Sequence, residues 1–291
     1  MLLKQQAELY TNDVLQAGVI ETIARESAVL EMLPFMEISG NSYKYNLEEA
    51  LPTVAFRDVN KGYEASEGTL DQETEGLVIL GGDVDIDRFL VQTKGDVNSI
   101  RTIQTEMKAK AVANTFTKTF FKGDADNDKF AFNGLDIRIT KRGGEQLVTF
   151  NEGEKLIDKL HELLDMVEGG ADVLYMSKKV RRELQKALEG QQHYIQVGRD
   201  EFGRVVEMFG DVQIRTVSDL ILEGGDIYAV KFGAMSHVAG LTNGGVQARD
   251  LGELDTLPVL RTRIEFYCGL AVFNPKAIAR LTDVLNPSAA A

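Results

Sequence analysis

The stretch VNSIRTIQTEMKAKAVANTFTKTFFKG, from Val97 to Gly123, is the longest helical pattern in the chain. About 26 residues rising 1.5 Å each predict a rod of about 39 Å, and the final glycine is a typical helix stop. Apolar residues recur along it at helical spacing. They predict one buried stripe, formed by Ile100, Ile103, Met107 and Ala111 and continued by Ala113, Phe116 and Phe120.

Upstream of this helix, residues 41–76 are rich in glycine, asparagine, serine and acidic side chains. Short apolar alternations at either end predict two strands that pair as one long hairpin. Between Asn46 and Gly76, eight acidic residues stand against two basic ones, so the net charge of this part is −6. A two-stranded ribbon has little interior and is marginal in water, so we expect it to gain stability from a neighbour.

The N-terminal region predicts a separate amphipathic helix over residues 11–33. Thr11 or Asn12 provides an N-cap, apolar side chains recur along the segment, and Pro34 ends it. A lone helix at the N-terminal end must bury its apolar face, and we expect it to do so against another element or another chain.

The rest of the chain mixes short strands and helices. Strands are predicted over residues 77–92, 136–140, 146–150, 172–176, 204–209, 212–217, 226–232 and 259–273. Helices are predicted over residues 152–168, 178–188 and 276–281. Asn151 and Glu154 form a capping box before the first of them. Strands and helices are segregated rather than strictly alternating, which predicts the α+β class.

Composition excludes several classes of protein. The chain has 291 residues, of which 44% are hydrophobic and 26% charged, so it is too apolar for general disorder. The sequence contains no apolar run of about 18 residues, so it predicts no membrane-spanning helix. Its first residues show no secretory signal. The single Cys268 cannot form an intrachain disulfide, which favours a reducing compartment. A net charge of −13 argues against a protein that grips nucleic acid, but not against one that encloses it.

The chain contains no complete catalytic or metal-binding motif. There is no Gly-x-Gly fingerprint, no Gly-Lys-Ser/Thr step and no Gly-x-Ser-x-Gly elbow. His161–Asp165 resembles a helical zinc site with aspartate as its second ligand, but its helix has committed both leucine faces to the core. Asp124–Asp128 resembles the start of a calcium loop, yet Lys129 and Leu135 occupy the glycine and glutamate positions. We therefore prefer a solvated helix face and turn chemistry, respectively.

Two charged groups have both a structural and a functional interpretation. Asp83, Asp85 and Asp87 lie about 6.7 Å apart along one strand face, too far to share one ion, so we expect a solvated or interface face. A basic turn stands at a predicted helix start, formed by Lys178, Lys179, Arg181 and Arg182. Positive charge is unfavourable there because of the helix dipole, which indicates either an anionic partner or a solvated face.

Cysteine and histidine provide no reactive centre. Cys268 lies on the apolar side of a predicted strand and fits a small core residue rather than a nucleophile. His161, His193 and His237 form no cluster in the sequence.

Five stretches follow the long helix in a characteristic order: FAFNGL (130–135), DVLYMS (172–177), MFGDV (208–212), IYAVKFG (227–233) and residues 261–279. With the preceding arm, acidic excursion and rod-like helix, this order resembles the major capsid protein of tailed phages, the Hong Kong 97-type shell fold. The first stretch is similar to the family's F-x-G-L step after its spine helix. The third resembles its F-G-x-P-V turn, although the proline is missing here. The others resemble the axial strands and the returning strand with its closing helix.

The resemblance implies an α+β, Hong Kong 97-like fold with four parts. They are an N-terminal arm (1–40), an extended β-hairpin loop (41–76), a peripheral domain with its spine helix at about 97–122 (77–130 and 255–291), and an axial domain (131–254).

By the same resemblance, the chain is a structural subunit, not an enzyme, and uses no cofactor. Many copies are expected to form hexamers and pentamers of an icosahedral shell that encloses double-stranded DNA without sequence-specific binding or membrane contact. A portal and a separate scaffolding protein are the further partners, and the location is the virion shell, assembled in the host cytoplasm. Two alternatives stay open: an encapsulin-type compartment around a cargo enzyme, and a soluble metal-dependent or hydrolytic enzyme with an unrecognised site.

From their opposite charges, we expect the acidic hairpin to lie against the rod-like helix of a neighbouring copy. The helix carries a net charge of +4 from Arg101 to Lys122. Exposed ion pairs contribute only about 0–1 kcal/mol each, but a closed symmetric shell repeats them many times. The expected contacts between subunits are Glu64, Glu67, Asp71 and Glu73 on the hairpin and Arg101, Lys108, Lys110 and Lys118 on the helix.

Overall fold

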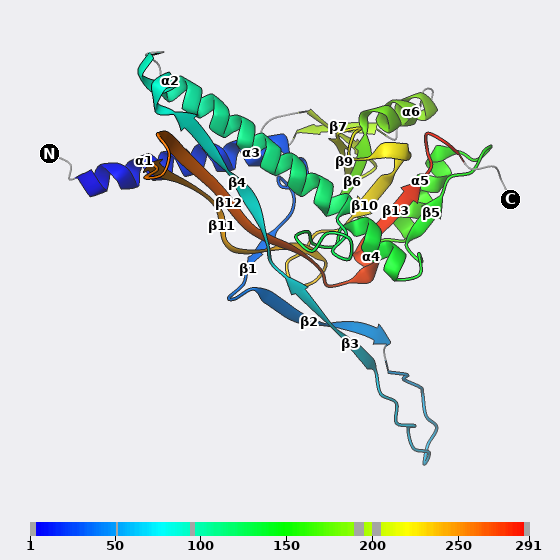
Figure 1. Cartoon of the computed structure of the whole chain (residues 1–291). Coiled ribbons are helices and arrows are strands. Elements are labelled where there is room, and N and C mark those ends of the chain that lie inside the picture. The colour runs from blue at the N-terminus through cyan, green and yellow to red at the C-terminus, as the bar shows by residue number, and fades with distance from the viewer. Residues whose placement is uncertain (1–3, 51, 94–96, 189–194, 200–204, 288–291) are drawn as a thin grey trace.

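The computed structural model describes residues 4–50, 52–93, 97–188, 195–199 and 205–287 (Figure 1). The helices are α1 (Lys4–Glu26), α2 (Arg88–Thr93), α3 (Val97–Lys122), α4 (Leu135–Lys141), α5 (Leu156–Asp165) and α6 (Lys178–Leu188), with short 3-10 turns at Glu223–Gly225 and Pro275–Ala277. The first strands are β1 (Phe35–Glu37), β2 (Ser42–Ala50), β3 (Thr69–Gly76), β4 (Val78–Asp87), β5 (Leu147–Thr149) and β6 (Val173–Ser177). The remaining strands are β7 (Ile195–Arg199), β8 (Val205–Phe209), β9 (Val212–Val217), β10 (Ile227–Val230), β11 (Val238–Glu253), β12 (Val259–Val272) and β13 (Ile278–Thr282).

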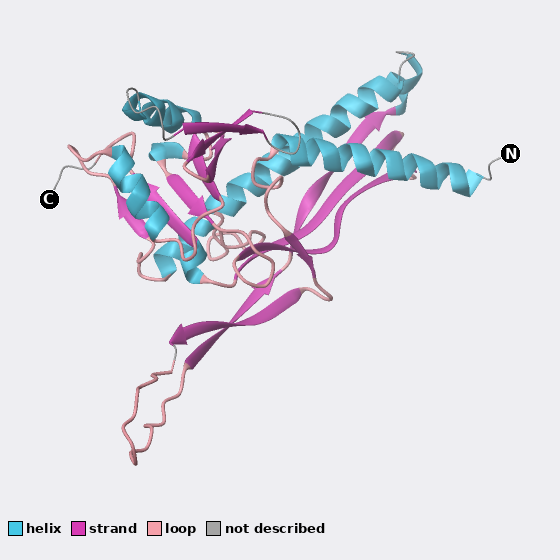
Figure 2. Cartoon of the chain, turned by 180° about the vertical axis from the view of Figure 1, so that it is seen from behind, coloured by secondary structure: helices cyan, strands magenta, loops and turns pink. Residues whose placement is uncertain are grey.

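A four-stranded sheet has the strand order β1-β11-β12-β4. The long strands β11 and β12 form its antiparallel centre, β4 pairs antiparallel with β12, and β1 runs parallel to β11. Helices α1 and α3 cover one face of this sheet (Figure 2). Val19 and Ile23 of α1 pack there with Ala109 and Ala113 of α3 over Ile264 of β12. The small alanine side chains let the two helices approach each other closely.

A seven-stranded mixed sheet has the order β5-β13-β10-β6-β9-β8-β7 and helices on both faces. Its strand β6 is buried along its whole length. Tyr175 of β6 points to the side of α3 and α4, whereas Leu174 and Met176 point to the side of α5 and α6. The alternation of side chains along a strand therefore divides the core of this sheet into two layers.

Helix α3 connects the two sheets. Its N-terminal half lies on the four-stranded sheet, and its C-terminal end carries Phe116, Phe120 and Phe121 into the core that borders the seven-stranded sheet. Phe121 contacts the rings of Tyr175 and Tyr228 at centroid distances of 5.4 and 5.0 Å. One continuous helix thus fixes the two sheets relative to each other.

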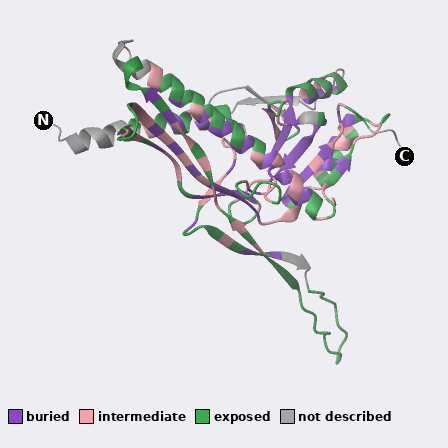
Figure 3. Ribbon diagram, viewed as in Figure 1, coloured by how far each residue is buried: buried purple, intermediate pink, exposed green. Residues whose placement is uncertain are grey.

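Strands β2 and β3 form a separate antiparallel ribbon that extends away from the two sheets (Figure 1). The loop that joins them reaches farthest from the body, and Figure 3 shows it exposed along its length. Only the base of the ribbon has a small core, in which Tyr45 and Leu47 pack with Leu241 and Ala271.

Several elements predicted from the sequence are confirmed. Helix α3 spans residues 97–122, and the acidic excursion is a hairpin. The alternation predicted for residues 259–273 is present in β12, where Thr262, Ile264 and Cys268 are buried. Ser177 caps α6, because its Oγ accepts the Val180 N–H at 3.3 Å.

The predicted N-terminal helix was misplaced. Helix α1 covers residues 4–26 rather than 11–33, so Thr11 and Asn12 lie inside it and do not cap it. The helix ends before Ser27, whose hydroxyl bonds to that of Thr117 at 2.7 Å. Beyond that point the chain turns, because Val29 and Leu33 are buried in the core at the end of α3.

The apolar stripe predicted on α3 was partly wrong. Ile103 and Met107 are 54% and 59% exposed, and the buried face runs instead through Ala109, Val112 and Phe116. Helix α1 and the sheet select this face because small residues permit the close approach of α1. The helix therefore has a second apolar stripe, which the residues described in the structure leave exposed.

Three other segments differ from the prediction. Residues 136–140 are helical in α4, since Leu135 and Ile139, four residues apart, both reach the core. Residues 278–282 form β13 rather than a helix. The predicted helix 152–168 begins only at Leu156: Glu154 does accept the Asn151 N–H at 2.8 Å, but this bond closes a turn before the helix.

Strand pairing also bears on the proposed domain boundaries. Strand β11 lies in the residue range expected for the axial domain but pairs with β12 in the four-stranded sheet. Strand β13 lies in the range expected for the peripheral domain but belongs to the seven-stranded sheet. We therefore propose an axial domain of residues 131–237 together with 275–287, and a peripheral domain that includes β11.

The two faces of α3 predict opposite effects of truncation. Phe116→Ala removes a fully buried ring and is expected to lower the free energy of unfolding by about 3–5 kcal/mol. Ile103→Ala, on the exposed face, is expected to change it by less than about 0.5 kcal/mol. Urea unfolding of the unassembled protein measures both, and equal losses would contradict the assignment of the buried face.

Candidate assembly surfaces

The outer part of the hairpin, residues 52–70, exposes apolar side chains. Val54 is 95% exposed, and Phe56, Val59 and Tyr63 are also exposed. The contacts within this segment are local, such as the bond from Ser66 Oγ to the carbonyl oxygen of Thr53 at 2.7 Å. Contiguous exposed apolar residues on a protruding segment mark a surface for interaction with another protein.

The acidic residues predicted for subunit contacts fall into two groups. Glu64, Glu67 and Asp71 are exposed, and none has an ion-pair partner among the residues that the structure describes. Glu73 lies nearer the base of the hairpin and accepts a hydrogen bond at 2.7 Å from Arg142, the C-cap residue of α4. The structure therefore uses Glu73 within the chain and leaves the outer three acids for other partners.

The basic residues predicted on α3 also divide. Arg101 forms an ion pair with Asp250 and donates to the Thr262 hydroxyl at 2.7 Å, and Lys110 pairs with Glu26 at 3.1 Å. Lys108 lies beside Gly82, near Asp83 of β4. Lys118 is exposed, with no ion pair in the described part of the chain. Lys118 is thus the cation most available to a second copy.

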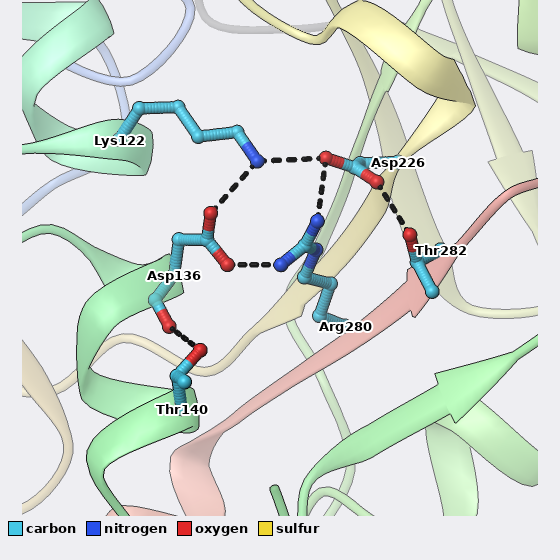
Figure 4. Close-up of polar contacts among 6 residues, drawn as sticks. All are labelled: Lys122, Asp136, Thr140, Asp226, Arg280 and Thr282. Atoms are coloured by element: carbon cyan, nitrogen blue, oxygen red, sulfur yellow. Dashed lines mark hydrogen bonds and ion pairs between the residues drawn. The ribbon is translucent and has the colours of Figure 1, made fainter.

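A network of partly buried charges lies where α3 meets the seven-stranded sheet (Figure 4). We call it the joint; it comprises Lys122, Asp136, Asp226, Arg280 and Thr282. Lys122 Nζ donates to both carboxylates at 2.9 Å, and Asp226, only 3% exposed, also accepts from Arg280 at 3.1 Å and from Thr282 at 3.1 Å. Arg280 also pairs with Asp136. Two cations and two anions balance, so the joint ties α3, α4, β10 and β13 together without an uncompensated charge.

The charge states of the joint follow from its neighbours. Burial disfavours the ammonium of Lys122, but Tyr228, Asp226 and Asp136 raise the pKa of Lys122 above its usual value. The ammonium also lies over the ring of Tyr228, 5.8 Å from its centroid. The pKa of Tyr228 is raised chiefly by burial. The structure requires all of these charges in place, and they form a fixed joint rather than a reactive centre.

The row of aspartates on β4 is a set of cross-strand ion pairs. Arg263 of β12 forms a two-pronged contact with Asp83 at 2.7 and 2.9 Å, and Arg261 forms one with Asp85 at 2.7 and 2.6 Å. These hydrogen bonds lower the pKa of both aspartates. Asp83 and Asp85 therefore have structural partners on the adjacent strand, whereas Asp87 accepts the Phe89 N–H at 2.7 Å.

The metal and nucleophile candidates take structural roles. Asp124 accepts the Asp126 N–H at 2.9 Å and so closes the turn after α3, which lowers the pKa of its carboxyl group. Cys268 is buried, and burial raises the pKa of its thiol to about 12. His161 is exposed on α5, and His193 lies outside the described residues. Within the described ranges, no group of three His, Cys, Asp or Glu side chains is placed to hold a metal ion.

The basic turn of α6 is partly neutralised. Arg181 forms a two-pronged pair with Glu207 at 2.9 and 3.0 Å, and Asp219 accepts the Lys178 N–H at 3.1 Å. The side chains of Lys178, Lys179 and Arg182 are exposed. Asp219 and Glu207 thus offset part of the unfavourable charge at the start of this helix.

A cavity of about 730 Å³ lies between α1 and α3. Leu15 and Val19 form apolar parts of its wall, and Arg101, Thr105 and Asp250 form polar parts. It holds no nucleophile paired with a general base. No helix in the described ranges is both long enough and apolar enough to cross a membrane.

Several solved structures share this architecture. The chain is similar to the encapsulin of the SrpI complex from Synechococcus elongatus, with a TM-score of 0.67, 16% identity, and coverage of 88% of this chain and 86% of that one. A structure from Mycobacterium phage Adephagia gives a TM-score of 0.66 at 10% identity, with 91% of each chain covered. The capsid of a native GTA particle gives 0.64 at 13% identity, again with 91% of each chain covered. The fold is therefore the Hong Kong 97-type fold of shell-forming proteins.

A match to a sequence family adds to this comparison of structures. Residues 11–149, from the arm through the hairpin and α3 to β5, match the family described as Major capsid protein GP7. No curated protein matches the chain. Together, the family match and the phage structures confirm the resemblance to the major capsid proteins of tailed phages. They indicate a structural rather than an enzymatic role.

Proposed function

We propose that this chain is the major capsid protein of a tailed phage. Many copies assemble through hexamers and pentamers into an icosahedral shell that encloses double-stranded DNA. The protein resides in the virion shell after assembly in the host cytoplasm. A portal and a separate scaffolding protein are its further partners.

The exposed apolar side chains of the hairpin are the observation that carries this proposal. Val54, Phe56 and Val59 lie on a segment that reaches away from its own body (Figure 1). Leaving such side chains in water forgoes about 1.5–3 kcal/mol each relative to full burial. A sister copy, meaning a second copy of the same chain, can cover them, and a closed shell repeats this contact for every subunit.

The outer face of α3 is the surface we propose for that contact. Ile103 and Met107 form an exposed apolar stripe one turn apart, and Lys118 extends the same face. The hairpin segment 52–71 offers apolar side chains together with four acids and two bases, a net charge of −2. Apolar contact supplies the affinity, and the charges of opposite sign set the register.

The exposure and ion pairs of the eight predicted contact residues support a smaller contact set. Glu64, Glu67 and Asp71 on the hairpin and Lys118 on α3 are exposed and unpaired in the described ranges, whereas Lys108 is half-buried beside Gly82 and near Asp83. Arg101 and Glu73 serve contacts within the chain, and Lys110 would have to exchange Glu26 for a partner on the sister copy. We keep the first four as the contact set.

The net charge of −13 suits a container for DNA. A lining that bound phosphate tightly would resist the entry and the exit of the duplex. Because nonspecific affinity for DNA comes from neutralised phosphates, an acidic subunit encloses the duplex without gripping it.

An encapsulin-type compartment is the second candidate. The similarity to the SrpI encapsulin supports it, because its TM-score of 0.67 equals or exceeds that of the Adephagia phage structure, 0.66. The contents of the particle distinguish the two functions: a phage head holds nucleic acid, and an encapsulin holds a cargo protein. A soluble metal-dependent or hydrolytic enzyme is disfavoured because Asp124 and Cys268 have structural roles and, within the described ranges, no group of three possible ligands is placed to hold a metal ion.

Overexpression of the full chain with its candidate scaffolding protein tests the function. Negative-stain microscopy and sedimentation are expected to show closed shells of uniform size that package nucleic acid when the packaging proteins are present. Particles that hold only a cargo enzyme would favour the encapsulin, and a monomer or dimer under all these conditions would contradict a shell function.

Charge reversal tests the contact between sister copies. Lys118→Glu is expected to raise the protein concentration needed for shell assembly several-fold at low salt, because each repeated contact loses about 1 kcal/mol. Light scattering against protein concentration measures that threshold. Lys155→Glu, an exposed lysine before α5, is the matched control and is expected to assemble normally.

Compensation on the hairpin completes this test. Glu64→Lys with Glu67→Lys is expected to restore assembly of the Lys118→Glu protein. Unchanged assembly of Lys118→Glu alone in low salt would count against the pairing.

A further inference from the structure

The base of the hairpin is fixed to its own chain by a cluster of side chains that we call the clamp: Tyr45, Glu73, Glu75, Arg138 and Arg142. Arg138 Nη1 donates to Glu75 Oε1 at 2.6 Å, and Arg142 Nη2 donates to Glu73 Oε1 at 2.7 Å. Tyr45, across from Glu73 in the ribbon, donates its hydroxyl to Glu73 Oε2 at 3.1 Å. The clamp therefore joins both strands of the hairpin to α4.

The spacing of the two ion pairs matches a strand to a helix. Glu73 and Glu75 lie two residues apart on β3, so they share one face at a separation of about 6.7 Å. Arg138 and Arg142 lie four residues apart, about one turn of helix, or roughly 5.4 Å along the axis. One ion pair would let the hairpin pivot about a point. Two adjacent pairs fix its direction as well as its position.

The inner half of the clamp is buried. Arg138 is 8% exposed and Glu75 is 13% exposed. The guanidinium also donates to the carbonyl oxygens of Asn133 at 3.0 Å and Leu270 at 2.9 Å. Its donors therefore join the hairpin to two separate segments of the body, and such charge-assisted bonds are among the stronger ones in proteins.

An aromatic contact supports the hairpin beside the clamp. The ring of Tyr45 packs against that of Phe273, with centroids 4.8 Å apart, and Tyr43 contacts the same ring at 6.2 Å. Burial raises the pKa of Tyr45, so its hydroxyl stays protonated and able to donate to Glu73. The hairpin base is thus held by both apolar and ionic contacts.

The same short helix also belongs to the joint. Asp136, in the first turn of α4, binds Lys122 of α3 and Arg280 of β13 (Figure 4). Arg138 of this helix and Arg142, its C-cap residue, bind the hairpin. The direction of the hairpin is therefore mechanically tied to the junction of α3 with the seven-stranded sheet.

We propose that α4 aims the hairpin: through Arg138 and Arg142 it sets the direction of residues 52–70 in the free subunit, before any sister copy is bound. Arg138 and Arg142 act as positioning residues, since they do not touch the partner themselves. A hairpin already held in its binding direction loses less conformational freedom on docking, which strengthens association. The benefit for assembly rests on the proposed shell function, whereas the direction of the hairpin is a property of the single chain.

The direction is measured in unassembled full-length protein separated from particles by size. Spin labels are placed on Gly62→Cys in the loop, where a side chain meets no neighbour, and on Asp158→Cys, exposed on α5. Cys268 is buried and stays unlabelled. Pulsed electron paramagnetic resonance then gives the distribution of distances between the two labels.

Removal of the outer ion pair is expected to release the hairpin. Arg142→Gln, and the charge-neutral double variant Arg142→Gln with Glu73→Gln, are expected to broaden the distribution by about twofold or more. Both sites are about one-third exposed, so the variants leave no bare buried charge. Lys141→Gln is the matched control: it removes the same charge from the adjacent residue, which pairs with Asp126 and not with the hairpin.

The outcomes separate this proposal from the shell function. A distribution as narrow in both Arg142 variants as in the Lys141→Gln control would overturn the role of α4, whatever the protein assembles into. Broad distributions together with a raised assembly threshold would support it. If the parent protein never forms shells, the shell function fails, and the label distances still decide whether α4 aims the hairpin.

Discussion

The outer half of the hairpin has no hydrophobic interior, and this constraint organises the rest of the molecule. Residues 52–70 place Val54, Phe56 and Val59 in water, beyond the small core at the base of the ribbon. A two-stranded ribbon is marginal without neighbours, so the stability that its own chain does not provide must come from other copies. The apolar stripe of Ile103 and Met107 on α3 is also exposed, and the contact that we propose between copies would cover both surfaces.

The body of the subunit is built to carry that contact. Helix α3 spans both sheets, so force or displacement at its exposed face reaches the seven-stranded sheet through the joint of Lys122, Asp136, Asp226 and Arg280. Helix α4 then links the joint to the hairpin base. The exposed face of α3 and the hairpin thus belong to one rigid framework. A repeating shell requires such a framework, because each subunit must present both surfaces at a fixed angle.

Strong periodic patterns let the sequence predict α3, β4 and β12, because each has one face committed to the core. Residues 136–140 misled the prediction, since the β-branched Ile137, Ile139 and Thr140 favour a strand, whereas tertiary contacts of Leu135 and Ile139 make a helix. That error hid the clamp: a strand would hold Arg138 and Arg142 about 13 Å apart, whereas one helical turn brings them to the spacing of Glu73 and Glu75. The acidic hairpin could be predicted from its charge. Which of its acidic side chains remain without an ion pair depends on contacts with α4, and neighbouring residues in the sequence do not reveal those contacts. The sequence did not predict β11, because glycines at positions 240, 244, 245 and 252 are unfavourable in a strand. This segment is a strand because it pairs with β12.

Disulfide trapping between two differently marked copies tests the central claim most directly. One copy carries Glu67→Cys on the hairpin, the other carries Lys118→Cys on α3, and the native Cys268 is buried and unreactive. If the hairpin lies along α3 of a sister copy, mild oxidation of mixed assemblies gives crosslinks that join the two kinds of chain, and neither mutant alone forms them. Efficient crosslinking within a single chain carrying both cysteines at high dilution, with none between chains, would contradict the account.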